Sequence, residues 1–152
     1  MTYTTAEARQ GLLDAFAESV DQIALALACL GEAYEQLDES SADRLEAELF
    51  RPAQAAYGRA KRTYSGFAER HDLSGRDFQP RSPGVASQST KELIERAVAA
   101  AGQGGQSIAS LQDSMLPIEV GDAELRDGLA EVRTLLDEIQ PRARELVRRL
   151  GR

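Results

Sequence analysis

The segment LDAFAESVDQIALALACLGEAYEQL, residues 13–37, decides the fold class. Its apolar side chains recur in alternating steps of three and four residues, which is the spacing of one face of an α-helix. The members of this series are Leu13, Phe16, Val20, Ile23, Leu27, Leu30, Tyr34 and Leu37. A heptad repeat of this kind indicates helices that pack with a gentle left-handed supercoil. We therefore expect a long, heptad-packed helix over residues 5–38.

A second series of the same kind covers the C-terminal part of the chain. Its members are Leu125, Leu129, Val132, Leu136, Ile139, Ala143, Leu146 and Leu150. Asp122 precedes the series and is a residue type that caps helix N-termini. Pro141 lies inside it and should kink the helix, because proline lacks the backbone N–H group. The pattern predicts a helix over residues 122–150.

The middle of the chain predicts two further helices, over residues 41–71 and 89–116. Serines at both starts can cap them, and Pro117 should end the second one. Pro52 should kink the first helix or mark its true start. Residues 72–88 contain prolines, glycines and serines without periodicity, which predicts one long loop between the two helices.

Together these segments predict an all-α protein with a single domain over residues 1–152, built as an antiparallel four-helix bundle. Two helix orders are compatible with the loop over residues 72–88. The alternating up-down-up-down order is preferred, because bundles with short connections dominate. In the other order the extended loop runs along the bundle. That order would place the arginine-rich C-terminal end beside the acidic turn that follows the first helix.

Composition excludes several classes of function. The chain has 152 residues and a formal net charge of −7, so a nucleic acid would be repelled by most of its surface. The longest apolar run, residues 23–30, is too short to span a bilayer, and the N-terminal residues do not resemble a secretory signal. We expect a cytoplasmic protein that binds neither nucleic acid nor a membrane.

The sequence contains no constellation typical of catalysis or metal binding. Metal sites in helical bundles use Glu-x-x-His motifs, but the only histidine is His71, and Ala68 occupies the position three residues before it. Cys29 and His71 are the only candidate pair of nucleophile and base, and no motif supports the pair. A lone cysteine in an apolar segment is more often a buried small side chain. We expect no enzyme and no cofactor.

Two groups of residues form a candidate ligand pocket. Tyr57 and Tyr64 are seven residues apart and should lie on one helical stripe. Gly104 and Gly105 lie in a glycine-rich part of the third expected helix. Small residues facing large rings favour close helix packing. The same arrangement could instead leave a cavity for an apolar ligand.

The apolar segment over residues 23–30 also predicts a covered surface. Leu25 and Cys29 lie opposite the heptad series, where a bundle helix normally carries polar side chains. Flanking helices, the long loop or a second protomer could cover them. Leu25 and Cys29 are therefore a candidate interface.

The segment Tyr34-Glu-Gln-Leu-Asp38 resembles the Tyr-x-x-x-Asp/Glu motif in substrates of specialised mycobacterial-type secretion. The Trp-x-Gly turn of those helical hairpins has no counterpart, because the chain contains no tryptophan. The resemblance implies an exported helical effector as one alternative function.

The absence of catalytic motifs and the clean heptads favour a non-enzymatic helical interaction or scaffold protein, with self-association into a homodimer as one form of it. The alternative is a small-molecule-binding bundle that uses the tyrosines and the glycine-rich segment. An exported effector is a further alternative. The sequence alone names no partner or ligand.

Overall fold

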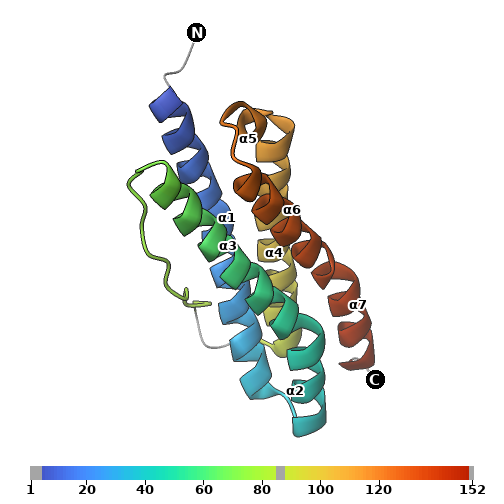
Figure 1. The fold of residues 1–152 in the computed structure, drawn as a ribbon. Coiled ribbons are helices and arrows are strands. Elements are labelled where there is room, and N and C mark those ends of the chain that lie inside the picture. Colours follow the sequence, from blue (N-terminus) through green and yellow to red (C-terminus); the bar gives the residue numbers. More distant parts are fainter. Residues whose placement is uncertain (1–4, 85–87, 151–152) are drawn as a thin grey trace.

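The computed structural model describes residues 5–84 and 88–150 of the chain. Within these residues every regular element is helical and no strand occurs. This confirms the prediction of an all-α fold. The elements form four rods that lie side by side (Figure 1).

Two of the rods are unbroken helices. They are α1, over Thr5–Gln36, and α4, over Thr90–Asp113. Ser89 caps α4 as predicted, since its hydroxyl oxygen accepts a hydrogen bond from the backbone N–H of Glu92 at 3.2 Å. The glycine-rich segment of α4 leaves the helix continuous.

The other two rods are each broken once. The first comprises α2 (Glu39–Leu45), a π-helical turn, η1 (Glu46–Phe50), and α3 (Arg51–Arg70). The second comprises α6 (Ala123–Asp137) and α7 (Ile139–Leu150). A short helix, α5 (Leu116–Glu119), joins α4 to α6.

Both breaks have a proline as their cause. A proline ring clashes with the carbonyl group four residues earlier and cannot donate to it. For Pro141 that carbonyl belongs to Asp137, the last residue of α6, so the predicted kink is confirmed. For Pro52 it belongs to Glu48, inside η1, where the N–H of Arg51 reaches back five residues to the carbonyl of Glu46.

Three predicted boundaries differ from the structure. The helix expected over residues 41–71 begins at Glu39, after Asp38, so neither Ser40 nor Ser41 caps it. The helix expected to reach residue 116 ends at Asp113, and Met115 follows with a positive φ of 66°. Pro117 lies in the first turn of α5 rather than ending α4, because its fixed φ suits the start of a helix.

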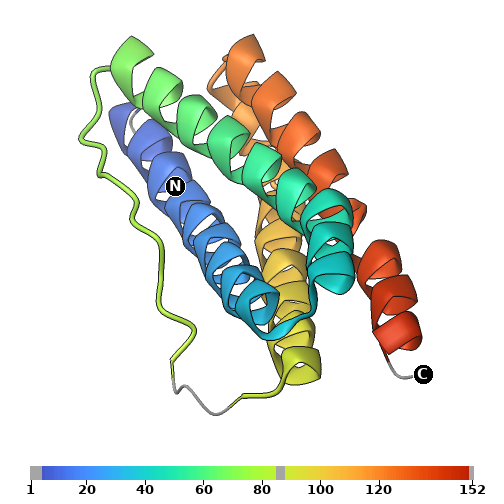
Figure 2. The same cartoon turned by 90° about the horizontal axis from the view of Figure 1, so that it is seen from below.

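The rods run in pairs of opposite direction. Helices α1 and α6 point one way, and α3 and α4 point the other way (Figures 1 and 2). Helix α1 packs against both α3 and α4, as does α6. Thus α3 and α4 occupy opposite corners. We call the two ends of the molecule the α2 end and the α5 end.

The connection from α3 to α4 runs back along the molecule, as Figure 2 shows. It starts at the α5 end, and α4 begins at the α2 end, where the hydroxyl of Thr90 donates to the side-chain oxygen of Gln36 at 2.8 Å. The alternating order preferred above is therefore not the one observed. We call residues 72–84 the crossing segment.

Side-chain contacts hold the crossing segment against α1 and α3. The ring of Phe78 meets the ring of Tyr64 edge-on, with centroids 4.8 Å apart. The backbone N–H of Arg76 donates to the hydroxyl of Tyr64 at 3.2 Å, and its guanidinium pairs with Asp21. These contacts offset the entropy cost of ordering the segment and explain why it lies along the bundle.

The two heptad series differ in burial. All members of the C-terminal series are buried except Leu150, which is half-buried. The series on α1 is buried from Leu13 to Ile23, but Tyr34 is 37% exposed near the α2 end. Leu30 of the series is buried there together with Cys29 and Ala33.

Candidate functional site

A charged cluster joins α3 to α6 at the α5 end. Arg70 forms two hydrogen bonds to the carboxylate of Asp122, at 2.8 and 3.0 Å, and a third to Glu124 at 2.6 Å. The Nε2 atom of His71 lies 2.8 Å from the same Asp122 carboxylate. Asp122 also caps α6 as predicted, accepting from the backbone N–H of Leu125 at 2.9 Å.

The environment of Asp122 fixes its charge. Burial alone would raise the pKa of its carboxyl group, but hydrogen bonds from Arg70, the Leu125 amide and His71 outweigh burial and lower the pKa to about 2. The side chain is 5% exposed. Since the oxygens of the Asp122 carboxylate are already shared among several donors, the cluster has a structural role and links α3 to α6.

Cys29 and His71 do not form a catalytic pair. Cys29 is fully buried near the C-terminal end of α1, whereas His71 follows α3 at the α5 end. Burial raises the pKa of the Cys29 thiol, and the nearby Arg96 only partly opposes this. A neutral, buried thiol is a poor nucleophile. In the part of the chain that the structure describes, no group of three metal-binding side chains occurs.

The candidate ligand pocket of two tyrosines and two glycines is not assembled. A Cβ atom at Gly104 would meet the Ser19 carbonyl and Ile23 on α1, and one at Gly105 would meet Leu136 on α6. Tyr57 and Tyr64 lie on α3, at the opposite corner from α4. The crossing connection therefore separates the rings from the glycines, and the expected ring-against-glycine packing does not occur.

The candidate interface on α1 is also largely covered within the chain. Cys29 has no exposed surface, and Leu25 is half-buried against the core. Helices α3 and α4 flank α1 along its length. Flanking helices therefore account for most of the apolar segment over residues 23–30.

A cleft of about 430 Å³ lies between α1 and α3, beside the crossing segment. Apolar and small side chains line most of it, including Ala24, Leu27, Ala28, Gly31, Phe50 and Pro80. Tyr57 forms part of its wall and is 9% exposed. The ammonium group of Lys61 lies 4.2 Å from the centre of the Tyr57 ring.

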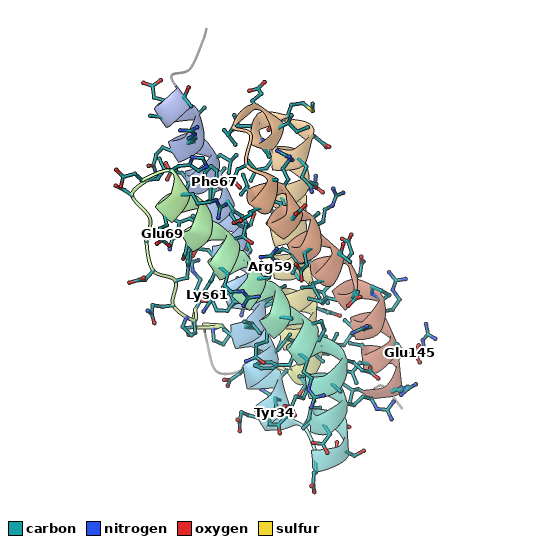
Figure 3. The ribbon with its side chains drawn as sticks, viewed as in Figure 1. Tyr34, Arg59, Lys61, Phe67, Glu69 and Glu145 are labelled. Atoms are coloured by element: carbon teal, nitrogen blue, oxygen red, sulfur yellow. The ribbon has the colours of Figure 1, made fainter. Side chains whose placement is uncertain are left out.

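Figure 3 shows Lys61 on the side of α3 that faces the crossing segment. Its neighbour Arg59 faces α6 instead and pairs with Glu131 at 2.6 Å. Among the described residues, no carboxylate lies within ion-pair distance of Lys61. The cleft therefore combines apolar walls with one unpaired cation.

A second depression runs between α4 and the α6–α7 rod. It consists of two adjoining parts of about 340 and 260 Å³, which share Val98 and Gln140. The part next to α6 is polar at Gln106, Arg133 and Asp137. The part next to α7 is mostly apolar, and its lining includes Ile94, Ala143 and Val147. We call the whole depression the α4–α7 groove.

The sequence identified Tyr57 and Gly105 as candidate pocket residues but did not identify the residues that surround them. Lys61 lies one helical turn after Tyr57, and this spacing was a signal that it would lie beside the ring. The α4–α7 groove has no comparable signal, because Val98 and Val147 belong to segments that are far apart in the sequence.

None of the helices in the described parts of the chain is long and apolar enough to cross a membrane. Comparisons with protein-family models, with curated proteins and with solved structures find no match to this chain.

Proposed function

We propose that this protein is a non-enzymatic helical interaction protein that forms a homodimer through its α4–α7 groove. The observation that carries the proposal is the groove itself, which is mostly apolar beside α7 and has charged side chains in its lining at both parts. Interfaces typically have an apolar core and a polar rim. Helical partners commonly insert an apolar face into such grooves.

The charges along the groove favour a second copy as the partner. Glu95 and Arg144 border its apolar part, and Arg133 and Asp137 border its polar part. A twofold interface brings the same surface of both protomers together. With both signs present on each rim, acidic groups of one copy can face basic groups of the other.

The absence of enzyme activity is part of the proposal. It is supported by the separation of Cys29 from His71 and by the saturated hydrogen bonding of Asp122. We also expect the purified protein to contain no stoichiometric transition metal by elemental analysis, because the described residues contain no group of three metal-binding side chains. About one zinc or iron per chain would contradict this.

We class the fold as a four-helix bundle with a crossover connection and heptad-type helix packing, supported by the buried C-terminal series. We also place the protein in the cytoplasm. The alternative of an exported effector rests on Tyr34, which is exposed at the end of α1 within its Tyr-x-x-x-Asp motif.

Light scattering over a range of concentrations tests the homodimer. We expect a dimer for the parent protein and a folded monomer for Val98→Glu, since a charge in the groove floor would be buried on association. Leu25→Glu is the matched control and should leave the mass unchanged. A monomeric parent protein would contradict self-association, and a monomeric Leu25→Glu variant with a dimeric Val98→Glu variant would move the interface to α1.

A second candidate function is the binding of a small molecule. The observation that favours it is the cleft between α1 and α3. Of the four residues in the pocket predicted from the sequence, this cleft contains Tyr57 but not Tyr64, Gly104 or Gly105. Its volume lies within the range of ligand sites in proteins.

A further inference from the structure

The geometry of the cleft between α1 and α3 points to a specific class of ligand. We propose that it binds a small apolar anion, such as an aliphatic carboxylate, with the charged end at Lys61 and the apolar body between the two helices. This inference deepens the second candidate function and is independent of the α4–α7 groove, which lies between the opposite pair of rods.

The walls of the cleft suit an apolar body. On α1, the small residues Ala24, Ala28 and Gly31 form a stripe about two turns long that leaves space beside Leu27. Phe50 closes the cleft at the end of η1, and Pro80 of the crossing segment borders it on the outside. The volume of about 430 Å³ falls in the range that holds small ligands.

Lys61 supplies the charge preference. The protein carries a net charge of −7 and only two lysines, Lys61 and Lys91. Arg76 and Arg81 of the crossing segment both approach Asp21. Lys61 instead stacks over the Tyr57 ring and keeps its hydrogen-bond donors available. A cation beside apolar walls attracts an anion with an apolar tail.

Tyr57 carries a polar group on the ring that Lys61 covers. Its hydroxyl is buried and has no hydrogen-bond partner among the described residues. Burial raises the pKa of this hydroxyl, and Asp21 raises it further, so the group stays a neutral donor. Buried polar atoms in proteins are nearly always satisfied. Because the hydroxyl is shielded from solvent, a ligand oxygen reaches it only when binding moves the side chains that cover it.

Calorimetric titration with monomeric decanoate, and with the neutral decanol as a comparison, tests the inference. We expect decanoate to bind the native protein and Lys61→Met to weaken that binding by about tenfold, as expected for the loss of a charged hydrogen bond. The affinity for decanol should stay unchanged. Lys91→Met is the matched control, because Lys91 is the other lysine and lines a different apolar depression.

A second variant, which fills the cleft with a larger side chain, tests whether the ligand binds there. Ala28→Leu should fill the cleft and abolish binding of both probes, with circular dichroism confirming the fold. If that variant unfolds, Gly31→Leu replaces it, since a Cβ atom at Gly31 meets no atom within 4 Å. The inference fails if decanoate does not bind, if decanol binds as tightly, or if Lys91→Met rather than Lys61→Met weakens binding. Light scattering of Val98→Glu reports separately on the homodimer, so either proposal can fail alone.

Discussion

The unbroken rods and the broken rods of this all-helical molecule show what proline does in a packed helix pair. Helices α1 and α4 contain no proline and pack against each other more extensively than any other pair of helices in the described residues. The other two rods each bend before a proline, at η1 and between α6 and α7. Helix α7 packs against η1, so the two bends face each other.

The bends coincide with the surface depressions. Phe50 ends η1 and closes the cleft between α1 and α3. Ile139 and Gln140, directly after the second break, line the α4–α7 groove. By contrast, the straight pair leaves little free space where Gly104 meets Ser19 and Ile23. Both depressions are thus lined by residues next to a break in a rod.

Replacing Tyr64 should give the largest loss of stability. It tests how strongly the α3 part of a broken rod is packed into the core. Tyr64 is 3% exposed and contacts Phe16 and Phe78. We expect Tyr64→Ala to lower the free energy of unfolding by about 3–5 kcal/mol, as for other buried aromatic residues. Chemical denaturation measures this. The exposed Tyr34 is the control, and a loss below about 1 kcal/mol for Tyr64→Ala would show that its ring is not part of the core.

Gly128 marks the closest approach within the broken pair. A Cβ atom there would lie 2.5 Å from Cγ2 of Thr63 and closer still to its hydroxyl oxygen. We expect Gly128→Ala to destabilise the protein by about 3 kcal/mol, because overpacking outweighs the better helix propensity of alanine. Thermal melting combined with Thr63→Gly checks the cause. The double variant should recover part of the loss, and purely additive losses would argue against a clash.

The Asp122 cluster should stabilise the contact between the two broken rods in a way that is lost at acid pH. The pKa of Asp122 is lowered from 3.8 to about 2, so its stabilising contribution is complete above the unfolded-state value and is lost as the pH falls from 3.8 towards 2. The shift corresponds to about 2 kcal/mol. Denaturation of the parent and of Asp122→Asn across this range measures it. The variant keeps a capping residue and should show a weaker pH dependence. An unchanged dependence would assign the acid sensitivity to other groups.

The smallest effect is expected on the unbroken pair. Gly11 lies within α1, and a Cβ atom added there would meet nothing within 4 Å. Gly11→Ala should therefore stabilise the protein by about 1 kcal/mol, since alanine loses less conformational entropy in a helix. Opposite signs for the changes at Gly11 and Gly128 would sharpen the contrast between the two pairs. Destabilisation by Gly11→Ala would contradict the open space around a Cβ atom at this position.

Sequence by itself determined the elements that depend on local chemistry. The series on residues 13–37 and 125–150 predicted two long helical rods, and the caps at Ser89 and Asp122 were predicted correctly. The break at Pro141 was predicted correctly, because the proline ring clashes with a carbonyl group only four residues earlier. Helix periodicity, capping and proline effects involve neighbours a turn away, so they can be read directly along the chain.

Only the tertiary structure decided which helices meet. The preferred alternating order was replaced by a crossover, held by contacts such as Arg76 with Asp21, which are far apart in the sequence. That crossover separates Tyr57 from Gly104 and leaves Lys61 beside an apolar cleft. Periodicity tells which face of a helix is apolar but not which rod covers it. That choice depends on the summed free energy of long-range contacts.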